Sequence, residues 1–224
     1  MFCGMLEVHP RSEQLNTYFS MAKMLKPELD KIEGFIENAR YNSLTRPGWI
    51  LSLSSWQDEK ALVRWSVESN HHKTMQTARD RIFADYRMHI GEFISDTHLP
   101  VGQTLLQQRL DVTEAAIGKA ITLLDVQREP DWVKQADADA VAKSLAFDPG
   151  AHSVVEWDVF DAIAAPGDVI ALVKWDDLAT AEAFAQNTTL PQGVRLRNIR
   201  VVRDYGMFDR REAPQYFAEV HTKA

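Results

Sequence analysis

Trp65, His72 and Arg79 are residues whose types and spacing suit chemistry on a small molecule. They are spaced seven residues apart, which is nearly two turns of an α-helix, so on a helix that begins after Asp58 they would share one face. An imidazole can accept a proton near neutral pH, a guanidinium can hold an oxyanion, and an indole can stack on a planar ring. The spacing therefore predicts a pocket in which His72 and Arg79 are catalytic and Trp65 binds the substrate.

Each of these residues also has a simpler interpretation. Trp65 can be ordinary core packing, because large aromatic residues are mostly buried. His72, which lies between His71 and Lys73, can belong to a solvated helix face, and Arg79 can be one partner of a surface ion pair. The spacing shows only that the three side chains share a face.

Other kinds of site are not indicated. Glu7, His9 and His89 could meet only through strand pairing, and no metal-ligand spacing is present. The sequence has no glycine-rich phosphate loop, so a nucleotide cofactor is not indicated. Cys3 is the single cysteine, which rules out an intrachain disulfide. We therefore expect no metal and no cofactor.

Composition narrows the partners. The net charge is −7 with scattered basic residues, which disfavours nucleic acid as a partner. No apolar run approaches the roughly 18 residues of a membrane span, and the first residues reach Glu7 too soon for a secretory signal. We expect a cytoplasmic protein whose partner is a small molecule.

The sequence contains one segment twice, at a constant offset of 119 residues. Trp56 matches Trp175 and Tyr86 matches Tyr205 at this offset. The other matching pairs are Glu37 with Glu156, Pro47-Gly48 with Pro166-Gly167, Asp58 with Asp177, Arg81 with Arg200, and Asp85 with Asp204. A constant offset means that the same elements recur in the same order.

Apolar and turn patterns predict the order βαββαβ in each copy. In the first copy we expect strands at 2–9, 35–44, 49–56 and 82–94, a first helix that Pro27 disturbs, and a helix over 58–79. In the second copy we expect strands near 116–126, 151–162, 166–175 and 197–208, a helix near 130–147, and one from Asp177 that Pro191 and Gly193 end. This order is the α+β, ferredoxin-like unit.

The sheet of such a unit has one face that its own helices do not cover. Ile50 and Trp56 lie on one face of their strand, and Leu51 and Leu53 lie on the other, so both faces need burial. We expect two ferredoxin-like βαββαβ repeats packed sheet to sheet as an intrachain α/β barrel. The expected parts are a first repeat at 1–96, a linker at 97–115, a degenerate second repeat at 116–212, and a tail at 213–224 (with Tyr216 and Phe217) that folds back on a domain edge. Further association into a homodimer stays open.

At this point the sequence resembles the antibiotic biosynthesis monooxygenase (ABM) domain of the dimeric α/β-barrel superfamily. The resemblance covers most of residues 1–95 and, more weakly, 116–208. It is carried by Gly34-Phe35, by Ser43 to Gly48, by Leu51 to Glu59, by Trp65 and His72, and by Arg81 to Tyr86.

What the resemblance implies is oxygenation by dioxygen without metal or flavin, here of an aromatic or quinol-type molecule. A deprotonated, electron-rich substrate can reduce dioxygen itself, so the protein supplies only a base, an oxyanion partner and a dry pocket. A small-molecule site with Trp56, Trp65, Ser52, Leu62 and Met75 in its wall is expected.

The sequence departs from the family at three of these positions. In quinone-forming members, an asparagine and a tyrosine assist the chemistry four residues before and six residues after the tryptophan that Trp56 matches; here Ser52 and Leu62 stand there. In haem-degrading members, a histidine follows the tryptophan that Trp65 matches by ten residues, and here that residue is Met75. Two alternatives therefore remain: a haem-binding or haem-degrading protein, and a non-catalytic binding or stress protein.

The second copy keeps none of the three residues of the stripe. At the constant offset, Phe184 replaces Trp65, Pro191 replaces His72 and Asn198 replaces Arg79. If one copy holds a site, we expect it to be the first.

Overall fold

The fold is a closed, antiparallel, eight-stranded barrel with helices on its outside, seen in a computed structural model that describes residues 1–151, 153–214 and 217. The first half contains β1 (Phe2–Pro10), a short 3-10 turn (Ser12–Gln14), α1 (Leu15–Leu29), β2 (Phe35–Ser43), β3 (Ile50–Trp56), α2 (Glu59–Val67), α3 (Ser69–Arg81) and β4 (Phe83–Asp96). The second half contains β5 (Ala120–Gln127), α4 (Pro130–Val133), α5 (Ala138–Ser144), β6 (Glu156–Ala162), β7 (Asp168–Trp175), α6 (Leu178–Asn187) and β8 (Arg195–Gly206).

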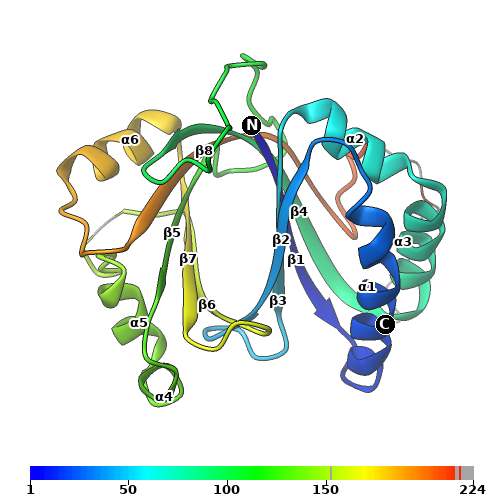
Figure 1. The fold of residues 1–224 in the computed structure, drawn as a ribbon, viewed down its shortest axis with the longest axis horizontal. Coiled ribbons are helices and arrows are strands. Elements are labelled where there is room, and N and C mark those ends of the chain that lie inside the picture. The colour runs from blue at the N-terminus through cyan, green and yellow to red at the C-terminus, as the bar shows by residue number, and fades with distance from the viewer. Residues whose placement is uncertain (152, 215–216, 218–224) are drawn as a thin grey trace.

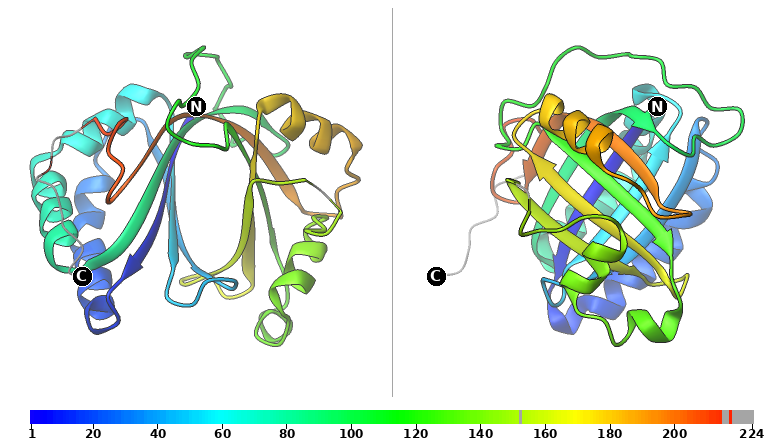
Figure 2. Two further views of the ribbon diagram at one scale, coloured as in Figure 1. Left: turned by 180° about the vertical axis from the view of Figure 1, so that it is seen from behind. Right: turned by 90° about the vertical axis from the view of Figure 1, so that its left-hand side faces the viewer.

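The strands follow one another around the barrel in the order β1-β3-β2-β6-β7-β5-β8-β4. Two pairings join the halves: β2 with β6, where Tyr41 faces Ala162, and β4 with β8, where Met88 faces Tyr205. Helices α1, α2 and α3 flank the first half on one side and α4, α5 and α6 flank the second half on the other (Figure 1). The strands are steeply tilted, as the side view shows (Figure 2), which closing a sheet into a barrel requires.

Alternation along the strands builds the barrel interior. Leu51 and Leu53 point inward, whereas Ile50 and Trp56 belong to the outer core of the first half, so the predicted division of this strand between two faces is confirmed. The inner core draws on both halves: Met1, Cys3, Met5, Leu51, Leu53, Phe93, Ile121, Leu123, Phe160, Ile170, Leu172, Ile199 and Val201. The inner faces of the two halves therefore bury one another, as an α/β barrel requires.

The helix predicted over 58–79 is two helices. Asp58 caps α2 by accepting a hydrogen bond from the Ala61 amide at 2.8 Å, as expected of an N-cap. Glu68 then takes an extended conformation (φ −57°, ψ 134°), and its side chain accepts a hydrogen bond from the His71 amide to start α3. The prediction of one continuous helix was wrong because a single extended residue resets the helical phase.

The helix predicted near 130–147 is also divided. Residues 134–137 separate α4 from α5, and Asp137 caps α5 through the Ala140 amide at 2.8 Å. Helix α1, in contrast, continues through Pro27 to Leu29. Helix α6 begins after Asp177 as predicted but ends at Asn187, before Pro191 and Gly193, which were expected to end it.

The predicted linker has no helix or strand over 97–119 and crosses one end of the barrel (Figure 2). It is tied down by Glu92, which accepts hydrogen bonds from the backbone amides of Gln108 and Arg109. In the tail, Phe217 is buried against the outer core, while Tyr216 lies outside the described residues. Within the described part of the chain, none of the helices is long and apolar enough to span a membrane.

A buried ionic junction joins the halves inside the barrel. The His89 ring lies between two carboxylates, with Nε2 2.9 Å from Glu7 Oε1 and Nδ1 2.6 Å from Asp204 Oδ2. Glu7 also pairs with Lys174 Nζ at 2.8 Å and with Arg46. Burial alone would raise the pKa of Glu7, but the cations around it hold that pKa well below its ordinary value.

Candidate functional site

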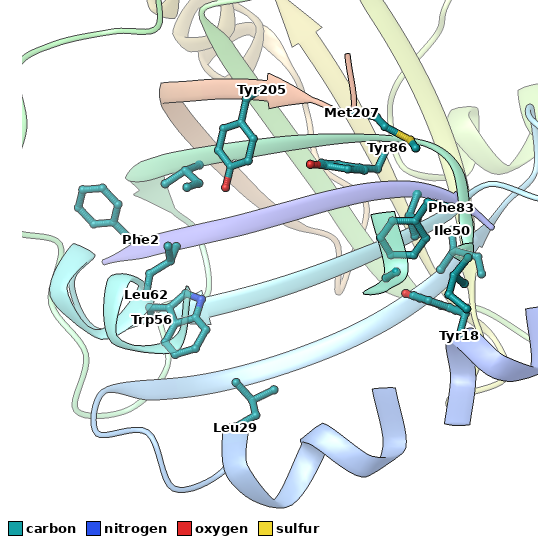
Figure 3. Packing of buried hydrophobic residues seen from close by; sticks show 14 of the residues in the cluster. Phe2, Tyr18, Leu29, Ile50, Trp56, Leu62, Phe83, Tyr86, Tyr205 and Met207 are labelled. Carbon is teal, nitrogen blue, oxygen red and sulfur yellow. The ribbon is translucent and has the colours of Figure 1, made fainter. Parts of the chain in front are cut away.

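A cavity of about 160 Å³ lies between the outer face of the first half of the barrel and helices α1, α2 and α3. Figure 3 shows part of its wall, with Tyr18 coming from the helix side and Trp56, Tyr86 and Tyr205 coming from the strands. The full lining is Gly4, Leu6, Tyr18, Met21, Ala22, Leu25, Lys26, Leu29, Asn38, Arg40, Ser52, Ser54, Trp56, Leu62, Trp65, Ser66, His71, Thr74, Met75, Ala78, Ile82, Phe83, Tyr86, Met88, Tyr205 and Phe217. Most of these side chains are apolar.

The five residues predicted to bind substrate all line this cavity: Trp65, Ser52, Leu62, Trp56 and Met75. Trp56 donates from Nε1 to Ser54 Oγ at 3.0 Å, so its polar atom is satisfied and the ring is fixed. The strand face that carries Trp56 and Ser52 therefore forms the floor, and the helices that carry Leu62, Trp65 and Met75 form the roof.

His72, the predicted base, is not among the lining residues; its neighbour His71 is. The break at Glu68 explains this. In one continuous helix the residue seven positions after Trp65 would share its face, but the new helix starts with a shifted phase and brings His71 onto the Trp65 ring instead, with 4.2 Å between ring centroids. His72 stacks on Phe217, with 5.0 Å between centroids.

Arg79, the second residue predicted to be catalytic, lies beside the cavity rather than in its wall. Its side chain is 1% exposed, and Nη1 donates to the Tyr86 hydroxyl at 2.5 Å. Its guanidinium also lies over the Phe217 ring at 5.3 Å. Arg79 thus holds Tyr86 and Phe217, two residues that do line the cavity, and it contacts the space only through them.

The cavity concentrates polar atoms that have no partner. Among the described residues, four buried side-chain atoms of its wall make no hydrogen bond of normal geometry: Tyr18 Oη, Asn38 Oδ1, Arg40 Nε and His71 Nδ1. Buried polar atoms are nearly always paired in native proteins, because leaving one unpaired costs free energy. Four such atoms around one apolar space are typical of a site that a ligand completes.

Asn38 also lines the cavity, next to Ser52, although the spacing of residues along the chain did not predict this. It lies on β2, and its Nδ2 donates to Ser52 Oγ at 3.2 Å and to the Leu53 carbonyl at 2.9 Å on β3. The family's asparagine position is occupied by Ser52, so this chain places an amide next to that position from the neighbouring strand. The free Oδ1 of Asn38 is left for another donor.

Burial shifts the pKa values of the titratable groups in the wall. It lowers the pKa of His71 to about 4, against an opposing effect of hydrogen bonds to the backbone of Trp65 and Ser66. It raises the pKa of Tyr18, although the nearby Arg40 guanidinium opposes the rise, and it raises the pKa of Tyr205. At neutral pH the histidine and both phenols are therefore uncharged, and the apolar cavity stays free of their charge.

In the second half, aromatic side chains pack where the first half has these residues. Phe184, which corresponds to Trp65, lies 5.2 Å from Trp175 and 6.2 Å from Phe147 between ring centroids. At the constant offset, Asn38, Arg40 and His71 correspond to Trp157, Val159 and Leu190, which belong to or pack against the core of the second half. That core is built from groups that need no ligand.

Of the four lining residues with an unpaired buried atom, three were not singled out in the sequence: Tyr18, Asn38 and Arg40. A signal for two of them was present, because Asn38 and Arg40 alternate along a strand and lie on the face that the helices cover. Polar residues on a face covered by helices are candidates for a site. Tyr18 lies on a helix near Leu15 and Phe19, and its pattern is that of a core residue.

No group of three or more His, Cys, Asp or Glu side chains suited to a metal ion occurs among the described residues. Lys26, the other cation of the wall, pairs with Asp30 one turn along α1. The polar groups that the wall offers to a ligand are therefore one imidazole, one guanidinium, one ammonium, several hydroxyls and an amide.

The chain is similar to a protein of established family over nearly its whole length. It is 38% identical to the "Jasmonate monooxygenase ABM" of the fungus Pyricularia oryzae (strain 70-15), across 222 residues that make up 97% of this chain and 98% of the relative. A scan against protein-family models finds no match.

Solved structures with a similar fold are more distant. A crystal structure of an anthrone oxidase-like protein is 12% identical and covers 96% of both chains, with a TM-score of 0.36. A crystal structure of an antibiotic biosynthesis monooxygenase is 11% identical and covers 40% of this chain and 95% of its own, also with a TM-score of 0.36. These two similarities are too distant to indicate function, but the near-complete match to the fungal relative confirms the resemblance found in the sequence. The chain belongs to the family of ABM-type monooxygenases.

Proposed function

We propose that this chain oxygenates a small, largely apolar molecule in the cavity beneath α1, α2 and α3, with dioxygen as the oxidant. The observation that carries the proposal is the set of four unpaired buried polar atoms around one apolar space. An apolar wall excludes water, and a few convergent polar groups fix the orientation of a ligand. The family membership adds the reaction class.

The reaction class that suits this wall is conversion of an activated CH₂ group into a carbonyl. One oxygen atom of O₂ enters the product, and the other leaves as water with the two hydrogens of the carbon, so dioxygen alone balances the reaction. Hydroxylation of a C–H bond, in contrast, needs two further electrons and two protons from an external reductant. The two outcomes are distinguished by whether turnover requires an added reductant.

His71 is the proposed proton acceptor. Its pKa, lowered by burial to about 4, means that the neutral ring is present at pH 7 with Nδ1 unpaired. Removing a proton from the substrate creates an anion beside the new imidazolium, and the two charges stabilise each other in a space from which water is excluded. Asn38 and Ser52, on the strands that face this helix across the cavity, supply further polar atoms that a ligand can contact.

Jasmonate is the first substrate to test, because the relative from Pyricularia oryzae carries that name. An aromatic or quinol-type molecule, expected from the family resemblance, is the second. Trp56 and Trp65 offer ring faces to either class.

The haem alternative is disfavoured by size. Pockets that bury drug-sized ligands are roughly 300–1,000 Å³, and this cavity is about 160 Å³. A non-catalytic binding protein remains the second candidate, because Ser52 and Leu62 occupy the positions at which the family's quinone-forming members carry assisting residues.

We further propose that the barrel is a duplicated ferredoxin-like unit, with repeats at 1–96 and 116–212, that forms a pseudo-dimer within one chain. The support is the strand order, which runs β4-β1-β3-β2 in the first half and β8-β5-β7-β6 in the second. The two orders are the same once each strand is numbered within its own half.

The test compares two adjacent histidines. Oxygen consumption and product formation are measured with jasmonate, and then with a quinol, for wild type, His71→Gln and His72→Gln, each with and without an added reductant. We expect His71→Gln to lose turnover by roughly 10²–10⁴-fold, the usual contribution of a general base, while His72→Gln stays near wild type. Equal activity of wild type and His71→Gln would remove His71 from the mechanism, and ligand binding without oxygen consumption would favour the non-catalytic binder.

A further inference from the structure

The cavity contains a cation with no anion to balance it. Arg40 lies on β2 in the cavity wall, and its Nε is buried and unpaired. No carboxylate lies within ion-pair distance of its guanidinium in the described part of the chain. Lys26, the other cation of the wall, already has Asp30. An arginine kept in an apolar surrounding without a counter-ion is costly unless an anion from elsewhere joins it.

Tyr18 stands beside this arginine. Its side chain comes from α1 into the same space (Figure 3), is 7% exposed, and leaves its hydroxyl unpaired. The Arg40 guanidinium is near enough to oppose the rise in the Tyr18 pKa that burial causes. A neutral phenol is a hydrogen-bond donor, and a guanidinium presents donors in a fixed fork. The Tyr18 oxygen lies within hydrogen-bonding reach of the Arg40 guanidinium, and its own O–H and the remaining N–H groups of the arginine are left for an acceptor that the described part of the chain does not supply.

Apolar side chains make up much of the remaining wall and would contact the body of the ligand. Met21 and Leu25 come from α1 and Leu6 from β1, and none of them can pair with a charge. A carboxylate matches the arginine fork through two parallel N–H···O bonds, whereas a neutral ester or ketone would leave the charge unbalanced. The ligand that fits is therefore an apolar molecule with one carboxylate.

The second half of the barrel supports a role in binding rather than folding. At the constant offset, Arg40 corresponds to Val159, which is fully buried in the core of that half. The corresponding strand in the second half therefore folds with an apolar residue at this position, so the fold itself does not require an arginine here. Among the described residues, Arg40 has the Tyr18 hydroxyl beside it but no carboxylate that would balance its charge.

We propose that Arg40 and Tyr18 bind the carboxylate of an amphipathic monocarboxylic acid, which makes such acids the substrate class of this site. The inference rests on the proposed function only for the word substrate; the binding site itself rests on the adjacent Arg40 and Tyr18 side chains and on the lack of a carboxylate for Arg40 among the described residues. The free acid and not its ester is then the ligand, and the carboxylate fixes which part of the apolar body faces His71.

The test uses acid and ester pairs as probes: jasmonate with methyl jasmonate, and octanoate with methyl octanoate. Affinities are measured by isothermal titration under nitrogen, so that no turnover consumes the ligand. The variants are Arg40→Met, Arg40→Lys and Tyr18→Phe. Lys23→Met is the matched control, because it removes an exposed cation of the same helix α1 that is not among the residues lining the cavity.

We expect Arg40→Met to weaken binding of the acid of at least one pair by roughly ten- to a hundredfold, the usual value of a charge-assisted hydrogen bond, while the affinity for its ester is unchanged. Arg40→Lys should retain part of the acid affinity, and Tyr18→Phe should cost roughly three- to tenfold. Lys23→Met should leave the affinity for both ligands unchanged. Retained ester binding shows in the same sample that the cavity of the variant is folded.

Three results would overturn the inference: equal losses for acid and ester in Arg40→Met, no loss for either, or a wild type that does not prefer the acid in either pair. Oxygen consumption in air is recorded separately. Acid selectivity through Arg40 without oxygen consumption would leave the binding site standing and refute the monooxygenase proposal, and oxygen consumption without acid selectivity would do the reverse.

Discussion

Replacing Lys174 by methionine should make the protein less stable in a way that depends on pH. Lys174 is 9% exposed and lies 2.8 Å from both Glu7 and Glu156. Methionine keeps much of the volume and removes the charge. Breaking a buried ion pair by removing one partner typically costs 3–5 kcal/mol, and Glu7 keeps Arg46 and His89, so we expect the lower end, about 3 kcal/mol. That is a large part of the 5–15 kcal/mol typical of a whole protein.

The pH dependence follows from the carboxylate. The pKa of Glu7 is lowered in the folded state, so its ionisation stabilises the fold above the unfolded value of about 4.3, and this contribution is lost as pH falls through the folded pKa. Losing Lys174 raises the folded pKa of Glu7 and reduces the contribution. The difference in free energy of unfolding between wild type and variant should therefore be full at pH 7 and should shrink at acid pH.

The assay is urea unfolding followed by circular dichroism, at half-unit steps from pH 7.5 down to the lowest pH at which wild type still folds. Lys134→Met is the control, because Lys134 pairs with Asp131 at the surface, where both side chains are mostly exposed, and such pairs contribute little. A destabilisation by Lys174→Met that stays constant with pH would refute the electrostatic reasoning and assign the loss to packing.

Three other substitutions or conditions test separate parts of the structure. Gly91→Ala should lower the free energy of unfolding in urea by about 1–3 kcal/mol or more, because an added Cβ would lie 2.2 Å from Ile199 Cγ2 and 2.8 Å from the Arg200 carbonyl oxygen. Gly150→Ala is the control and should be neutral, because the nearest atom to its added Cβ is 3.6 Å away. Equal stability of the two variants would contradict the close approach of β4 and β8 at Gly91. If His71 is the base, the turnover rate should be flat from pH 6 to 8 and fall as pH drops through about 4; an inflection near 6.5, the ordinary histidine value, would contradict a base whose pKa burial has lowered. Asp58→Ala removes the cap of α2 and should cost roughly 0.5–2 kcal/mol, measured as a lower urea midpoint, and an unchanged midpoint would show that the cap hydrogen bond is not formed in solution.

The sequence predicted the surroundings of the site better than its reactive groups. Alternation along residues 50–56 correctly divided Ile50 and Trp56 from Leu51 and Leu53, because a strand offers only two faces. The i, i+7 argument failed for His72, because Glu68 leaves the helix for a single residue and no proline or glycine marks the break.

Pairings between distant segments were also beyond the sequence. The hydrogen bond from Asn38 to Ser52 depends on the register of β2 against β3, and that register is set by the packed sheet rather than by local preference. Arg40 could have been recognised as polar on a covered face, but the lack of a carboxylate for it among the described residues is visible only in the folded structure.

Closure of the barrel within one chain has a consequence for the protein in solution. The β2–β6 and β4–β8 pairings are intramolecular, so the barrel cannot come apart into two pieces on dilution. A barrel assembled from two separate chains would lose stability as concentration falls, by mass action. Here closure of the barrel itself should add no dependence of the unfolding temperature on protein concentration, and the cavity, which is built from one chain, should still bind its ligand at the lowest concentration at which binding can be measured.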